Sequence, residues 1–211
     1  MKKIILFVVG LSLFLLTAGC GTGKENPTPA TGTNGITAQE VRVATQPSPV
    51  MAPIFVAKQK GWLEEEFKKV GVTVKWSSFT AGPPMNESFA AGQQDIGFLG
   101  DSAAIIPKSA GQNIRIVSVA GAAPKGLALM VAKDSNIAAV SDLKGKKVAV
   151  VKGSYAHHLV VLALKNAGLT TDDIQLLNMT PADIGTALAK GDVDAGAVWE
   201  PLLTQLDRKS V

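Results

Sequence analysis

A lysine, a glycine and a serine, Lys152, Gly153 and Ser154, stand between a β-branched apolar run and a stretch that predicts a helix over residues 155–167. Backbone N–H groups at the start of a helix are free, and together with the helix dipole they attract a negative charge. The same serine could serve as an ordinary N-cap residue. We expect Gly153 and Ser154 to hold an oxyanion at this helix start.

Two adjacent histidines, His157 and His158, follow on the same predicted helix, and the chain contains no others. Neighbouring residues of a helix point to different faces, so these two imidazoles cannot share a metal ion. A zinc or iron centre would need more ligands than remain. We therefore expect no metal site and no cofactor, with His157 facing the ligand and His158 facing solvent.

Two further helix starts carry capping residues. Asp101 and Ser102 follow a predicted strand, where either could cap the next helix and also contact a ligand. Thr180 and Asp183 flank Pro181 in a complete capping pattern, and we expect this pair to be structural.

Trp199 and Glu200 end an Ala- and Gly-rich strand run. We expect the Trp199 ring to lie at the carboxyl edge of the sheet and not in its core, where it could cover an alkyl chain or stack on a cation. A carboxylate at Glu200 would favour a ligand that bears an amine.

Arginine occurs only at Arg42, Arg115 and Arg208, the first two inside predicted strands, so no bidentate arginine clamp is expected. An anion would depend on backbone N–H groups and on neutral side chains. The side-chain candidates are Gln46, Ser48, Ser102, Ser154 and His157.

Short apolar runs alternate with amphipathic stretches, a pattern that predicts parallel β-sheets covered by helices on both faces. The runs are residues 41–44, 72–76, 96–99, 114–119, 127–132, 148–151, 174–177 and 195–198. In open α/β sheets, ligands bind beyond the carboxyl ends of the strands. All the candidate residues above lie at such ends.

An internal echo suggests two similar halves. Residues 89–97 match residues 188–196 in their apolar, Ala, Gly and Asp positions, with Gly92 and Gly191 separated by 99 residues. Each copy predicts a helix that ends at a left-handed glycine, followed by an acidic turn into a buried strand. A chance similarity between two common helix-to-strand joints is the alternative.

The N-terminus carries targeting signals. Lys2 and Lys3 precede an apolar stretch too short for a membrane span, and small residues lead to Cys20, so residues 1–19 are a predicted signal peptide. The chain has one cysteine, which cannot form an internal disulfide. The segment that ends at Cys20 resembles the bacterial lipobox, which implies that Cys20 is acylated as a membrane anchor. We expect a flexible tether over residues 20–40, rich in Gly, Thr and Pro, to follow.

The charge balance argues against a nucleic-acid partner. Removing Lys2 and Lys3 from the 21 basic residues leaves 19 against 17 acidic residues, a net charge of +2. The sequence also lacks a basic run or an aromatic-basic platform.

Several of these segments, read in order, resemble the aliphatic-sulfonate-binding proteins of ABC importers, within the class that binds sulfonates, taurine, nitrate and thiamin precursors. The segments are Phe79-Thr80-Ala81-Gly82-Pro83, residues 95–102, Lys152-Gly153-Ser154-Tyr155-Ala156-His157, Thr180-Pro181-Ala182-Asp183 and residues 193–201. The Leu16-Thr17-Ala18-Gly19-Cys20 segment resembles the bacterial lipobox, although leucine is commoner where Thr17 stands.

The resemblance implies a type II periplasmic-binding-protein-like α/β fold, with two doubly wound lobes around a cleft. We expect lobe 1 over residues 41–123 and lobe 2 over residues 124–211. Family members continue beyond this length, so we expect the C-terminal part to be missing and lobe 1 to be incomplete. The resemblance places Ala81, Gly82, Asp101, Ser102, Gly153, Ser154 and His157 at the cleft.

The implied protein is an extracytoplasmic lipoprotein that binds a small organosulfonate and delivers it to the membrane subunits of an importer, as a monomer. Nitrate or a thiamin-pyrimidine precursor are alternative ligands. A sensory receptor would use the same cleft. A fold-related thiamin-pyrimidine synthase is an enzymatic alternative, but those enzymes carry a cysteine-rich motif, and this chain has one cysteine. We therefore do not expect an enzyme.

Overall fold

The structure is a computed structural model that describes residues 39–209. The predicted signal peptide, Cys20 and nearly all of the predicted tether lie outside the described residues. Within the described part of the chain, no helix is both long and apolar enough to cross a membrane.

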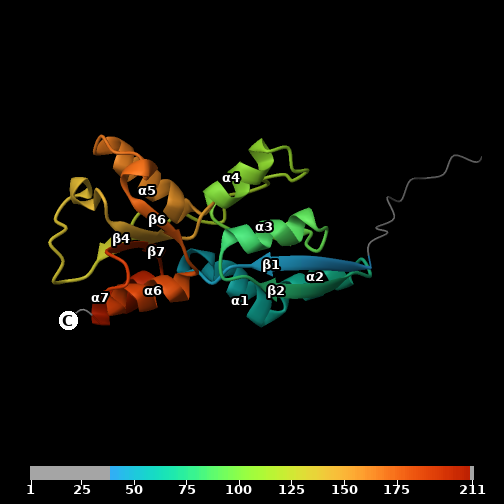
Figure 1. Cartoon of the computed structure of the whole chain (residues 1–211). Helices are drawn as coiled ribbons and strands as arrows, with labels where there is room; N and C mark the ends of the chain where they lie inside the picture. Colours follow the sequence, from blue (N-terminus) through green and yellow to red (C-terminus); the bar gives the residue numbers. More distant parts are fainter. Residues whose placement is uncertain (1–38, 210–211) are drawn as a thin grey trace, which may run out of the picture. The chain divides into compact units, whose positions relative to one another are not determined.

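Three parallel strands form the first sheet, in the spatial order β2-β1-β3. The strands are β1 (Glu40–Thr45), β2 (Thr73–Ser78) and β3 (Ile96–Gly97). The helical elements of this half are η1 (Pro49–Met51), α1 (Ala52–Lys60), α2 (Trp62–Lys68), α3 (Gly82–Ala90) and α4 (Asp101–Ser109). In Figure 1, α1 and α2 lie on one side of β1 and α3 on the other, so Val43 and Ala44 are fully buried.

Four strands form the second sheet, in the order β4-β7-β5-β6. The strands are β4 (Leu127–Val131), β5 (Lys147–Val150), β6 (Gln175–Asn178) and β7 (Ala195–Trp199). The helical elements are η2 (Val140–Leu143), α5 (Tyr155–Asn166), η3 (Thr171–Asp173), α6 (Pro181–Lys190) and α7 (Leu202–Lys209). Figure 1 shows α5 on one face of this sheet and α6 and α7 on the other.

The expectation of purely parallel sheets is wrong for β4, which pairs antiparallel with β7, from Leu127 opposite Trp199 to Val131 opposite Ala195. Strand β4 is at the edge of the sheet, where an antiparallel strand can be added to an otherwise parallel sheet without a crossover connection. The apolar sequence of β4 predicts burial but carries no information on strand direction.

Each sheet contains the same joint, in which an aspartate before the start of one strand forms hydrogen bonds with the neighbouring strand. Asp95 accepts a hydrogen bond from the N–H of Arg42 at 2.8 Å and donates its own N–H to the carbonyl of Arg42 at 2.9 Å. Asp194 repeats both bonds with Lys147, at 2.8 and 2.9 Å. These bonds hold β3 against β1 and β7 against β5.

The helix before each joint ends as the internal echo predicts. Gly92 follows α3 with a φ of 67°, and Gly191 caps α6 with a φ of 75°, in the left-handed region that glycine adopts without a steric penalty. The predicted echo is confirmed as a structural repeat.

The predicted strand at residues 114–119 is wrong. Ile116, Val117 and Val119 are 55%, 89% and 82% exposed, and the segment belongs to neither sheet. The backbone N–H groups of residues 115–120 have no hydrogen-bond acceptor among the described residues. A β-branched run forms a strand only beside a neighbouring strand, and none of the strands of the two sheets pairs with this segment.

The main hydrophobic core lies in the second half of the chain. With the exception of Ala81, its buried members fall between Leu143 and Trp199. All five residues of β7 are buried, and α6 packs so closely on it that a Cβ at Gly196 would lie 2.5 Å from Cγ2 of Ile184. This close packing explains the Ala- and Gly-rich composition of β7.

Adjacent valines of α5 provide a matched test of this core. Val160 is fully buried, whereas Val161 is 37% exposed. Because Val160→Ala removes two buried carbon atoms and leaves a cavity, we expect it to lower the free energy of unfolding by about 2 kcal/mol. Val161→Ala carries the same change in helix propensity and should stay within about 0.5 kcal/mol of the wild type in urea denaturation. Equal effects of the two substitutions would contradict this description of the core.

Candidate functional site

A pocket of about 610 Å³ lies at the carboxyl ends of β2, β5 and β6. Thr80, Ala81 and Pro83 form its wall on the side of the first sheet. Its wall on the side of the second sheet includes Val151, Lys152, Asn178, Met179 and Thr180. Strands of both sheets therefore end at one pocket, as the rule for open α/β sheets requires.

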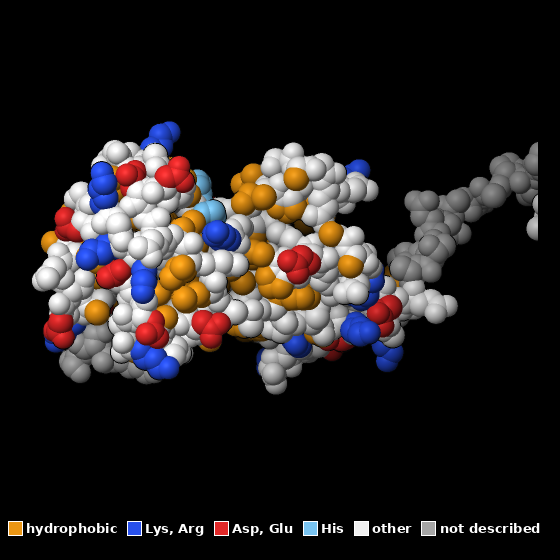
Figure 2. Space-filling model, in the orientation of Figure 1, with side chains coloured by type: hydrophobic (Ala, Val, Ile, Leu, Met, Phe, Trp, Pro, Cys, Tyr) orange, Lys and Arg blue, Asp and Glu red, His pale blue; other side chains and the backbone are white. Residues whose placement is uncertain are grey.

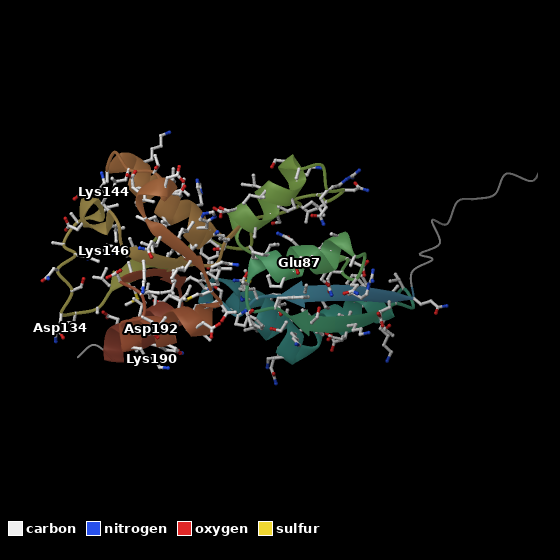
Figure 3. All side chains as sticks on the ribbon, viewed as in Figure 1. Glu87, Asp134, Lys144, Lys146, Lys190 and Asp192 are labelled. Atoms are coloured by element: carbon white, nitrogen blue, oxygen red, sulfur yellow. The ribbon has the colours of Figure 1, made fainter. Side chains whose placement is uncertain are left out.

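The charged groups of this pocket are one ammonium and three carboxylates. Lys152 is exposed and forms no ion pair among the described residues. The carboxylates are those of Glu87, Asp183 and Asp192, of which Glu87 lies on α3 and Asp192 follows α6 (Figure 3). The pocket can therefore attract an anion at Lys152 and a cation near the acidic residues.

The loop between β5 and α5 satisfies most of its own donors. The Gly153 N–H donates to Nδ1 of His157 at 3.3 Å. The Ser154 hydroxyl is 1% exposed, donates to the carbonyl of Val151 at 2.7 Å and accepts from the His157 N–H at 3.4 Å. Ser154 thus forms the ordinary N-cap that was the alternative to anion binding, and its proton is already committed.

Two other amides lie at this helix start, those of the half-buried Tyr155 and the fully buried Ala156. The N–H groups of Tyr155 and Ala156 have no acceptor in the described part of the chain. They belong to the first turn of α5, where the helix dipole adds about 0.3 to 1 kcal/mol for a negative charge. The unpaired backbone N–H groups at this helix start are therefore those of Tyr155 and Ala156, whereas those of Gly153 and Ser154 donate to His157 and to Val151.

The pKa of His157 is below its ordinary value of 6.5. Burial is the main cause, followed by the positive charges of Lys152 and His158. The neutral imidazole is also the form that can accept the Gly153 N–H at Nδ1. The two histidines reach the surface beside α5 (Figure 2), and His158 is exposed, as predicted.

The start of α3 contributes few donors. Ala81 is its N-cap residue, Gly82 is its first residue, and Pro83 and Pro84 follow without N–H groups. A Cβ at Gly82 would collide with Ala103 of α4, so glycine here allows the two helices to approach closely. Ala81 and Gly82 are buried, and Ala81 is the member of the predicted binding set that lines the pocket.

A second group of predicted residues gathers around Tyr155. A Cβ at Gly100 would collide with the Tyr155 ring, so the start of α4 approaches the start of α5. Asp101, the first residue of α4, accepts hydrogen bonds from the N–H and hydroxyl of Ser102. Gly100, and neither of these two residues, holds the N-cap position of α4. Burial, followed by the charge of Asp101, raises the pKa of Tyr155.

Trp199 ends β7 as predicted, but its ring belongs to the hydrophobic core. It is 5% exposed, and its centroid lies 5.1 Å from that of Tyr155. The expectation of a ring outside the core is therefore wrong, because β4 and α5 both pack on β7 and cover the strand end. The Glu200 carboxylate accepts from the N–H and hydroxyl of Thr204 at 3.1 and 2.7 Å, so it holds the first turn of α7.

Gln46 is the predicted residue with an unpaired group. It follows β1, is 1% exposed, and its Oε1 has no hydrogen-bond partner in the described part of the chain. An unpaired buried polar group costs about 1 to 3 kcal/mol, so this position is suited to a ligand that completes the bond. Ser48 is half-buried, precedes η1, and its side chain caps nothing there.

Sequence reasoning missed two residues, Lys152 and Tyr155. Lys152 was placed in the loop but assigned no role, although it is the cation of the pocket. Tyr155 is the chain's single tyrosine and stands at the first position of α5, a pattern that could have identified it from the sequence. The predicted capping role of Thr180 and Asp183 is confirmed by the bond from the Asp183 N–H to the Thr180 hydroxyl at 3.3 Å. Within the described residues no cluster could hold a metal ion.

Comparison with known proteins identifies the family. The family model described as NMT1/THI5 like matches residues 48–210, and the chain belongs to this family. A protein of Bacillus subtilis named as an aliphatic sulfonates-binding protein is 36% identical over 97% of this chain and 58% of its own length. An Escherichia coli protein of the same name is 41% identical over 70% of this chain and 46% of its own length.

Solved structures of sulfonate-binding proteins resemble this chain as well. The alkanesulfonate-binding protein of Xanthomonas axonopodis pv. citri, bound to MOPS, has a TM-score of 0.74 at 33% identity, covering 82% of this chain and 58% of that one. The periplasmic aliphatic sulphonate binding protein of Escherichia coli has a TM-score of 0.68 at 36% identity, covering 82% and 55%. The predicted resemblance and α/β fold class are thereby confirmed. The chain spans about half the length of the relatives it matches.

The pocket lysine should control the titration of His157. We expect an imidazole pKa below 6.5 by NMR in a His158→Gln background, and a higher value when Lys152→Met removes the nearby positive charge. Lys165→Met, at the last turn of the same helix, is the control and should leave the titration unchanged.

The lowered pKa of His157 sets the sign of the pH dependence of the protein's stability. Because the folded chain binds the His157 proton less readily than the unfolded chain, the free energy of unfolding should fall as the pH drops below about 6.5. A His157 titration midpoint above 6.5, or one insensitive to Lys152→Met, would contradict the geometry.

Proposed function

We propose that this chain belongs to the solute-binding component of an ABC importer and that it binds a small organosulfonate in the pocket at the carboxyl ends of β2, β5 and β6. The observation that carries the proposal is the pocket itself, which is lined by the ammonium of Lys152, a group that forms no ion pair among the described residues. The names of the Bacillus subtilis and Escherichia coli relatives support the choice of ligand.

The chemistry of the pocket suits binding better than catalysis. A sulfonate spreads its charge over three oxygens, which can pair with the ammonium of Lys152 in the pocket. The Ser154 hydroxyl donates to a backbone carbonyl, and the Nδ1 of His157 accepts from Gly153, so these two side chains do not form a nucleophile and base pair. We infer a binding protein without enzymatic activity.

The acidic residues of the pocket support a ligand that also carries an amine. A positively charged group of the ligand can be attracted by the carboxylates of Glu87, Asp183 and Asp192. The Glu200 carboxylate instead accepts a hydrogen bond from Thr204. The taurine-binding periplasmic protein of Escherichia coli is 32% identical over 67% of this chain and 43% of its own length. Ala81 lines the pocket, and Gln46, Ser48, Asp101 and Ser102, which lie at neighbouring strand ends, remain proposed contacts.

The same proposal sets the location and partners. We infer an extracytoplasmic protein, held at the membrane by a lipid on Cys20, that delivers its solute as a monomer to the membrane subunits of the importer. The periplasmic relatives support the location. The tether predicted over residues 20–40 would allow the binding unit to move between the anchor and the importer.

A ligand screen tests the binding proposal. A thermal-shift panel of alkanesulfonates, taurine, nitrate and pyrimidines should show stabilisation by sulfonates, since a ligand at 100 times its Kd contributes about 2.7 kcal/mol. In calorimetry, Lys152→Met should weaken sulfonate binding about 10-fold or more, the scale of one charge-assisted hydrogen bond. Lys165→Met is the matched control. Stabilisation by none of the sulfonates, or unchanged affinity of Lys152→Met, would refute the proposed site.

The anchor has its own test. Intact-mass analysis of membrane-extracted protein should give a mature chain that begins at Cys20 and carries acyl groups, because this residue follows the predicted signal peptide. Cys20→Ala should abolish the modification and release the protein from the membrane fraction. A water-soluble product with unmodified Cys20 would show that the anchor does not exist.

A further inference from the structure

Asn178 is the last residue of β6 and lines the same pocket as Lys152. Its backbone is fixed at the strand end, because Asn178 pairs with Val150 of β5. The next N–H along the chain, that of Met179, also donates to the Val150 carbonyl, at 3.0 Å. The sheet therefore holds Asn178 beside the loop that carries Lys152.

A hydrogen bond fixes the orientation of the Asn178 amide. The backbone N–H of Lys152 donates to Oδ1 of Asn178 at 2.9 Å. Because only the oxygen of a side-chain amide can accept this bond, the other branch of the group must be Nδ2 with its two N–H donors. These donors have no acceptor among the described residues. A pair of free donors is thus held at the pocket by the same residue that supplies the ammonium.

The other neutral polar side chains on the second-sheet wall of the pocket have committed their protons. The Thr180 hydroxyl donates to the Asp183 carboxylate at 2.7 Å, and the Thr186 hydroxyl donates to a backbone carbonyl of α6 at 3.1 Å. The carboxylates of this wall accept hydrogen bonds and, when ionised, donate none. Among the described side chains of this wall, Lys152 and Asn178 are therefore the two that offer free donors to a ligand.

We propose that Asn178 is a sulfonate-binding residue, whose Nδ2 group donates to one sulfonate oxygen while the Lys152 ammonium pairs with another. The inference rests on the proposed function and names the neutral donor of its anion site. A sulfonate has three acceptor oxygens, so it can bind both side chains at once. Because Oδ1 of Asn178 already accepts the Lys152 N–H, this group presents donors to the ligand, and it favours an anion over an ammonium.

The assignment also orients the ligand. The sulfonate lies at the end of the pocket formed by Lys152 and Asn178, and an amine on the same ligand is directed to the carboxylates. Two of these, Glu87 and Asp192, come from α3 and from the turn after α6 (Figure 3).

Calorimetry of the full chain with ethanesulfonate tests the role of Asn178. Asn178→Asp has nearly the same shape and keeps an oxygen for the Lys152 N–H, but it has no N–H donors and adds a negative charge. Asn178→Ala removes both the donors and the oxygen without adding a charge. Each variant should weaken binding about tenfold or more, the scale of one hydrogen bond to a charged group.

Thr186→Asp is the matched control for the added charge. Thr186 is exposed on the same wall, and its hydroxyl bonds within α6, so the substitution adds a carboxylate without removing a free donor. The affinity should fall less in Thr186→Asp than in Asn178→Asp. A residue that only positioned the Lys152 loop would tolerate Asn178→Asp, which keeps the bond to the loop. Equal affinities of Asn178→Asp and Thr186→Asp would therefore overturn the inference.

NMR of the wild-type protein provides a readout that does not depend on the folding of any variant. The side-chain amide signal of Asn178 should shift when ethanesulfonate saturates the pocket, because Nδ2 gains an acceptor. The signal of Asn166, exposed at the far end of α5, should stay in place. An Asn178 signal that does not move at saturation would refute direct contact.

The outcomes separate this inference from the proposed function. Sulfonate binding that is weakened by Lys152→Met but unchanged by Asn178→Ala would refute the role of Asn178 while the proposed function stands. Binding of no sulfonate by the wild type, taurine included, would refute the proposed function, and the role of Asn178 with it.

Discussion

The position of the candidate site depends on one interaction, made twice. In each half of the chain, an aspartate at the end of a helix-to-strand turn bonds to both backbone groups of a residue on the neighbouring parallel strand. The guanidinium of Arg42 also donates hydrogen bonds to the Asp95 carboxylate. These bonds are the main cause of the lowered pKa of Asp95. Among the described residues, Asp194 has no comparable side-chain partner, since Lys147 contributes only its backbone.

These joints fix which residues emerge at the opposite ends of the strands. Because Asp95 locks β3 to β1, the turn after β3 brings the start of α4 to its place beside α5. Because Asp194 locks β7 to β5, the loop that carries Lys152 and the end of β7 stay in register. The individual bonds are exposed and of modest worth, but together with the buried strands they leave the strand-end loops little freedom.

Sequence patterns predicted the repeat, the strands of both sheets, and the capping pair of Thr180 and Asp183, but they also predicted a strand at residues 114–119 that does not form. These features depend on local signals, such as a left-handed glycine or a β-branched run between turns. The antiparallel direction of β4, the burial of the Trp199 ring and the commitment of the Ser154 proton depend on which elements pack together. The sequence around Ser154 is compatible with both a helix cap and an anion site. The hydrogen bond from the Ser154 hydroxyl to the Val151 carbonyl, which the sequence does not reveal, decides between them.

The bond between Gly153 and His157 would couple a proton to a bound anion. The negative charge of an anion near the start of α5 would favour the protonated imidazole, which can no longer accept the Gly153 N–H at Nδ1. Anion binding and protonation of this histidine would therefore be thermodynamically linked, each increasing the affinity for the other. Such a site would take up protons as it fills and release its solute more readily as the surroundings become less acidic.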